Sequence, residues 1–264
     1  MKKFIFGIIF LFLLLPISQS YPQEYTDTNP SLTISMNSDN NFVYRDSEGY
    51  TVVIGLIENN DPLSFVTNVV IQANFYDDFN SNPLEVKEGT TTLKAIPPNS
   101  NSPFMIRSDN PDIDITQVYT KFLTFDTSES MKNSLITSNA TVFLDPIYNL
   151  SDSTYTLSFS GTLQNGNAPI SATFAYLAFY DVFDRIIQIS SIEIGDVGMN
   201  EMKSLKLTEE ISTSAVGFLL FSESDKFYST ILNVKIPPPE IYIELATISD
   251  VTVKDTLGTK LSEV

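Results

Sequence analysis

YTVVIGLIEN, residues 50–59, is followed by Phe-Tyr-Asp at 75–77, and the chain repeats this order. The second copy reads YTLSFSGTLQN at residues 155–165, with Phe-Tyr-Asp at 179–181. The two glycines are 106 residues apart (161 minus 55) and the two triplets 104 apart (179 minus 75). That spacing is too long for a solenoid repeat and fits a whole small domain. The sequence therefore predicts two tandem copies of one module.

Apolar residues recur at every second position in both copies, as in residues 69–75 and 155–163. This period of two is typical of strands in a sheet with one buried face. Turn-forming residues interrupt the runs at 59–62, 80–83, 97–100 and 165–167. Short strands joined by such turns predict an all-β fold of two tandem β-sandwiches of the immunoglobulin or fibronectin type.

The repeat also predicts where each module ends. FLTF at residues 122–125 parallels FLLF at 218–221, and we interpret both as penultimate strands followed by a final strand. We therefore expect the first sandwich at residues 21–145 and the second at 146–236. Residues 237–264 begin with three prolines, which form an extended spacer. The strand-like runs after them predict a short β-type C-terminal extension, the opening of an incomplete third module.

The N-terminus has the order of a secretory signal peptide. Lys2 and Lys3 precede an apolar run from Phe4 to Leu15, and small residues lead to a cleavage site after Ser20. The alternative is an uncleaved anchor, although a full span needs roughly 20 apolar residues. We expect residues 1–20 to direct the chain outside the cell or to the cell surface. Membrane contact is expected only through this peptide if it stays uncleaved.

Composition excludes several classes of function. Without the two lysines of the signal peptide, 13 basic residues face 32 acidic ones, a net charge of −19. So acidic a surface repels nucleic acid and anionic lipid. The chain has no cysteine, histidine or tryptophan. Disulfides, Ser-His-Asp and Cys-His catalysis, and zinc sites of the ordinary kinds are thereby excluded.

The ordered pattern of these motifs resembles the FxLYD family. The resemblance rests on the strand with its glycine and asparagine, the strand ending in Phe-Tyr-Asp, and the Pro-Asn-Ser-rich loop before Pro103-Phe104. It covers residues 45–125 and 150–222, although the second copy lacks the proline-rich loop. The tandem arrangement resembles secreted multi-domain proteins of ammonia-oxidising archaea. The resemblance implies an extracellular β-sandwich without known catalytic residues.

One acidic run is a candidate calcium site. Asp109, Asn110, Asp112 and Asp114 offer oxygen ligands, three of them at alternate positions that can point at one centre. The alternative is a solvated acidic turn, because no glycine or downstream glutamate completes a recognised calcium loop. We expect no other cofactor.

Carboxylates after the two Phe-Tyr strands are candidates for acid–base chemistry. Asp77 and Asp78 follow the first strand, and Asp181 and Asp184 the second. Such pairs could serve a glycoside hydrolase. Their recurrence at one place in both modules instead favours a structural role, in which each accepts hydrogen bonds from the turn it opens.

Two further features concern partners. Phe174, Tyr176 and Tyr180 lie on one face of a strand and are a candidate contact surface, since Tyr and Phe are favoured interface anchors. The alternative is that this face is buried, in its own module or against the first one. Asn139 and Asn149 head glycosylation sequons.

Together these features predict an exported, non-catalytic structural, adhesive or binding protein of the cell surface, with a protein or glycan partner. The alternatives are a cation- or glycan-binding surface module, and a carboxylate-dependent glycoside hydrolase or its accessory domain.

Overall fold

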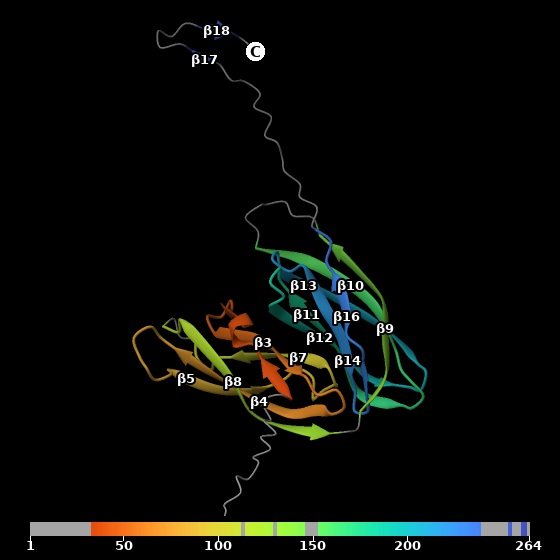
Figure 1. The fold of residues 1–264 in the computed structure, drawn as a ribbon. Helices are drawn as coiled ribbons and strands as arrows, with labels where there is room; N and C mark the ends of the chain where they lie inside the picture. The colour runs from red at the N-terminus through yellow and green to blue at the C-terminus, as the bar shows by residue number, and fades with distance from the viewer. Residues whose placement is uncertain are drawn as a thin grey trace, which may run out of the picture. The chain divides into compact units, whose positions relative to one another are not determined.

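The structure, a computed structural model, describes residues 33–111, 114–128, 131–145, 153–238, 253–254 and 260–262. Within these ranges the chain is all-β, and the strands are joined by turns and one three-residue 3-10 segment at Ser38–Asn40 (Figure 1). This confirms the all-β fold class. The expected signal peptide lies outside the described residues.

No helix in the described part of the chain is long and apolar enough to cross a membrane.

The first eight strands, called the N-terminal group, form two four-stranded sheets. They are β1 (Ile34–Met36), β2 (Phe42–Arg45), β3 (Thr51–Asn59), β4 (Phe65–Tyr76), β5 (Glu85–Thr90), β6 (Ala95–Ile96), β7 (Ser100–Arg107) and β8 (Gln117–Ser128). In one sheet β1 and β2 pair with the two ends of β3, and β7 pairs along it. In the other, β4 pairs with β5, β6 and β8.

Both sheets contribute to one apolar core. The alternation predicted along β4 is confirmed, because Val69, Ile71, Ala73 and Phe75 are all buried there. They share the core with Val53 and Ile57 of β3 and Phe104 and Ile106 of β7. Alternate residues of a strand point to opposite faces, so the buried set of each strand points towards the other sheet.

The next eight strands, the C-terminal group, form a single eight-stranded sheet in the order β12-β11-β14-β15-β9-β10-β13, with β16 also on β14. They are β9 (Lys132–Leu144), β10 (Thr154–Gln164), β11 (Ile170–Tyr180), β12 (Ile186–Val197), β13 (Met202–Ser212), β14 (Gly217–Glu223), β15 (Phe227–Ser229) and β16 (Leu232–Lys235). The short strand β15 pairs with both β14 and β9 and so joins the two layers of this sheet. The end strands β12 and β13 are consecutive in the chain, and the sheet curls around a second core.

Strand β9 corrects the expected domain boundary. The sequence pattern predicts residues 132–144 at the end of the first module, yet β9 pairs with β10 and β15. Its Leu135 is 1% exposed in the C-terminal core, where the apolar face of β9 is covered. β9 lies beside β10 as β1 and β2 lie beside β3. The boundary between the groups therefore falls between Ser128 and Lys132, not near residue 146.

The two groups share a pairing pattern. Strands β3 and β10 pair with β7 and β13, while β4 and β11, which both end in Phe-Tyr, pair with β8 and β14. Both groups belong to one compact unit. The C-terminal group ends at Ile236, which packs on its core, and Pro237 and Pro238 are exposed.

Of the expected C-terminal extension, the structure describes only β17 (Val253–Lys254) and β18 (Lys260–Ser262), which pair antiparallel with each other.

Candidate functional site

The candidate contact surface on β11 lies against the N-terminal group. Tyr176 stacks near Phe174, with ring centroids 6.1 Å apart, and near Phe221 of β14 at 5.5 Å. Tyr180 is 4% exposed, and its hydroxyl donates to Asn233 at 2.7 Å. The structure thus places Tyr176 and Tyr180 in an interior shared by the two groups, while Phe174 is half-buried beside Tyr176.

We call this interior the interface cluster. Its buried members come from both groups: Val52, Ile54 and Leu93 from the first, and Ala178, Tyr180, Ile186 and Phe221 from the second. Strand β3 therefore buries both of its faces, one in the N-terminal core and one in the interface cluster. This explains why residues 52–57 are apolar at every position except Gly55, as expected for strands covered on both sides.

One buried carboxylate lies at the edge of the interface cluster. Glu223, at the end of β14, is 3% exposed, and its two oxygens accept the backbone N–H of Lys94 at 3.2 and 3.1 Å. Burial raises the pKa of Glu223 to about 7, and the hydrogen bonds from the backbone oppose the rise. Burial, with the nearby Glu223 charge, raises the pKa of Tyr176 to about 12. Glu223 was not found by sequence reasoning, because its burial depends on a contact 129 residues away.

The candidate calcium ligands are placed as follows. Asp109 pairs with Lys87, and its backbone N–H donates to Glu85 Oε1 at 2.6 Å. The carbonyl of Asn110 accepts the Ser108 hydroxyl at 2.9 Å. Asp112 lies outside the described residues, and Asp114 already interacts with another group of the protein. Within the described ranges no three acidic side chains come together as a metal site would require.

The carboxylates after the Phe-Tyr strands bind turns, as predicted. Asp77 accepts the backbone N–H of Asn80 at 2.7 Å. Asp181 accepts the N–H of Phe183 at 2.9 Å and the Arg185 guanidinium at 2.9 and 2.6 Å. Desolvation opposes ionisation of both carboxyls, but these hydrogen bonds outweigh it and lower the pKa of each.

Their neighbours are also engaged locally. Asp78 accepts the Thr116 hydroxyl at 2.7 Å, and the N–H of Asp184 donates to the Asp181 carbonyl at 3.0 Å. Asn139 is exposed on β9, and its carboxamide donates to Thr162 at 3.3 Å. Asn149 lies outside the described residues.

A groove of about 380 Å³ lies between the two groups. Its walls are Pro97, Pro98, Asn99, Ser100, Asn101, Asn133, Tyr228, Ser229, Thr230 and Ile231. None of these side chains is charged, although the chain has a net charge of −17. Asn101 has a buried Oδ1 without a hydrogen-bond partner, and Asn99 has a φ of 50°, a conformation that asparagine tolerates better than most residues. The walls therefore offer amide and hydroxyl groups beside one aromatic ring.

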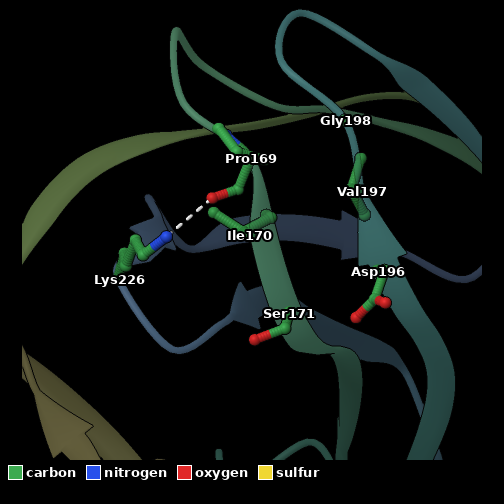
Figure 2. A pocket seen from close by; sticks show the side chains of 7 residues that line it. All are labelled: Pro169, Ile170, Ser171, Asp196, Val197, Gly198 and Lys226. Carbon is green, nitrogen blue, oxygen red and sulfur yellow. Dashed lines mark hydrogen bonds between the residues drawn. The ribbon is translucent and has the colours of Figure 1, made fainter.

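A second hollow, of about 360 Å³, lies at one end of the C-terminal group (Figure 2). Figure 2 shows Pro169 to Ser171 in the middle, Asp196 to Gly198 on the right, and Lys226 on the left. The Lys226 ammonium donates to the Pro169 carbonyl at 2.9 Å, so this cation is already bound by the chain. The groove is the better candidate for a ligand.

Two buried asparagines hold corresponding turns, although the sequence showed them only as the last residues of the two repeated stretches. Asn59 donates to the carbonyls of Ser64, Ile96 and Pro97 at 2.9 to 3.0 Å. Asn165 donates to the carbonyls of Ala168, Val197 and Gly198 at 2.8 to 3.3 Å. Each lies four residues after the glycine of its copy, so the repeated asparagine has the same structural role in both copies.

No family model matches the chain, and no curated protein matches it. Among solved structures, red sea bream transglutaminase is 13% identical, with a TM-score of 0.23, over 84% of this chain and 34% of that one. A calcium-binding mutant of Bacteroides uniformis beta-glucuronidase 2 is 11% identical, with a TM-score of 0.28, over 73% of this chain and 27% of that one. The chain thus spans about a third or less of these enzymes, and such low TM-scores carry no argument about its function.

Proposed function

We propose that this chain is an exported, non-catalytic structural or adhesive element of the cell surface, built from two tandem immunoglobulin-like sandwiches of the FxLYD kind. Support for tandem modules comes from the shared pairing pattern and from the matched asparagines Asn59 and Asn165. Support for a non-catalytic role comes from Asp77 and Asp181, whose carboxylates are occupied by turn amides.

The interface cluster is the observation that carries the proposal. It joins the sandwiches through Val52 and Ile54 on one side and Ala178 and Phe221 on the other, all at most 2% exposed. Apolar burial of this kind holds two domains at one angle, whereas polar and smaller interfaces allow relative motion. A pair of sandwiches fixed in this way acts as a stiff spacer or a rigid display surface.

Two measurements test the proposal. Trypsin applied to intact cells that carry the native gene should degrade the protein while a cytoplasmic marker survives; protection until lysis would refute a surface location.

Small-angle X-ray scattering should give one fixed separation of the sandwiches. Ala178→Asp, which places a charge in the interface cluster, should increase the radius of gyration, whereas Ser191→Asp, an exposed position, should not. A spread of separations in the unaltered protein would contradict the stiff spacer.

The groove favours a second candidate function, binding of a neutral glycan. Uncharged amides and hydroxyls around Tyr228 match the hydroxyls and apolar face of a sugar, and none of them carries a charge that would favour an ion. Saturation-transfer NMR with neutral oligosaccharides should show binding that Thr230→Arg abolishes, because Thr230 is exposed in the groove wall. Thr208→Arg, at an exposed position on β13, is the matched control. Equal signals from both variants would exclude the groove.

A further inference from the structure

Over residues 117–127, strand β8 has one edge that pairs with no other described strand. Among the described strands it pairs only with β4, and its twelve residues make it one of the longest strands of the N-terminal group. Its counterpart β14 lies between β11 and β16 (Figure 1). In the C-terminal group the antiparallel strand β16 thus occupies the position beside β14 that is open beside β8. A long open edge presents backbone N–H and C=O groups that can pair with another strand.

The side chains of β8 do not oppose such pairing. Lys121 and Asp126 are its only charged residues, so the strand is neutral in a chain of net charge −17. Tyr119 and Leu123 are 59% and 38% exposed. The edge therefore combines exposed apolar side chains with one charge of each sign, and like-charge repulsion along it is absent.

A bulge sets the faces of β8. Phe122 pairs with Ile71 and Thr124 with Val70, so Leu123 is an extra residue. Because of this shift Phe122 and Phe125 both pack against the N-terminal core, with ring centroids 6.3 Å apart. In a regular strand residues three apart would point to opposite faces.

The same bulge makes the strand complementary to itself. Lys121 and Asp126 are both exposed and lie at equal distances from the midpoint between Leu123 and Thr124. Two copies of β8 aligned antiparallel about that midpoint would bring Lys121 of each copy opposite Asp126 of the other, and Phe122 beside Phe125. In this one alignment the apolar faces coincide, the opposite charges meet and the strands run antiparallel, as a two-fold interface requires.

We propose that β8 pairs with β8 of a second copy of this chain, which gives a two-fold dimer with one sheet running through both N-terminal groups. The proposal adds a partner to the proposed function and does not depend on it, because it concerns association and not location or ligand.

Charge reversal tests the register. In sedimentation equilibrium of the full chain, from micromolar to millimolar concentration, Lys121→Glu should weaken the dimer about tenfold, since two attractive pairs become repulsive. Lys121→Glu combined with Asp126→Lys should restore it. Asp126 also accepts the Asn68 carboxamide at 2.8 Å, so circular dichroism must show that each variant keeps its fold.

Cysteine cross-linking gives an independent readout, because the chain has no cysteine. Lys121→Cys with Asp126→Cys should yield a disulfide-linked dimer under mild oxidation; the two positions are too far apart along one strand to bridge within a copy. Lys206→Cys with Glu210→Cys, on the exposed face of β13, should stay monomeric.

A monomer at every concentration would overturn the proposal. The proposal would also be overturned if charge reversal left the association intact and deletion of residues 239–264 abolished it. In that case residues 239–264, and not a second β8, would occupy the edge.

Discussion

Replacing Glu223 by glutamine should stabilise the protein at pH 8 and remove most of its pH dependence between pH 5 and 8. Glu223 is 3% exposed and has a pKa of about 7, raised by burial from its ordinary value of 4.5. Glutamine has nearly the same shape and keeps an oxygen that can accept the Lys94 N–H. The substitution therefore removes a buried charge at high pH and little else.

The sign follows from proton linkage. Between pH 4.5 and 7 the folded state keeps the Glu223 proton that the unfolded state has lost, so the free energy of unfolding falls as pH rises through this window. The stabilisation is fully present below pH 4.5 and lost above about pH 7. At about 1.4 kcal/mol for each pH unit, the interval from 4.5 to about 7 corresponds to about 3 kcal/mol.

Urea unfolding at a series of pH values from 5 to 9 measures this effect. The chain has no histidine or cysteine, so few other groups titrate in the window. The unaltered protein should lose about 3 kcal/mol across it, while Glu223→Gln should stay nearly flat. Glu210→Gln, at an exposed position, should follow the unaltered protein. The same slope for Glu223→Gln and the unaltered protein would refute the assignment of the pKa to this carboxyl.

Three further changes test the packing. Phe75→Ala should lower the free energy of unfolding by about 3–5 kcal/mol in denaturant titration, because the ring is fully buried in the N-terminal core; an unchanged midpoint would contradict that burial. Gly217→Ala should cost about 1–3 kcal/mol in the same assay, since an added Cβ would meet the ring of Tyr180 at 2.5 Å; unaltered stability would show that the ring moves aside freely. Asp181→Asn should remove stability above the ordinary pKa of aspartate, where the carboxylate binds Arg185 in the folded state, and the loss should shrink as pH falls towards the lowered pKa of the folded protein. Thermal melts at pH 3 and 7 check this, and an equal loss at both would assign the effect to shape instead of charge.

Local pattern predicted the strands well, and pairing less well. Phe75 and Phe179 are both fully buried, as their place in the alternation predicted, and the aspartates after them bind turns. A strand's own sequence shows which face is apolar, but not which sheet will cover that face. Residues 132–144 show this limit, because their alternation is that of any half-buried strand. They belong to the C-terminal group because Leu135 packs in its core and β9 pairs with β10.

The candidate site was harder to predict, because it depends on long-range contacts. The groove joins residues 97–101 to residues 228–231, and Glu223 meets Lys94 across the interface. Neither pair has a motif in the sequence. The calcium candidate shows the converse, since Asp109 stands in a suggestive acidic run and yet pairs with Lys87.

One signal of the interface was nevertheless present in the sequence. Strands that face solvent on one side alternate, whereas residues 52–57 and 177–180 are apolar at almost every position except Gly55. In the structure these two runs meet: Val53 and Phe179 fill the two separate cores, while Val52 and Ala178 lie in the interface cluster. Each group alone would expose an apolar sheet face to water, a liability for a soluble domain. The two sandwiches are therefore expected to be stable as a pair and not as independent modules. An isolated N-terminal group, residues 31–128, should aggregate or associate through its exposed Val52, Ile54 and Leu93.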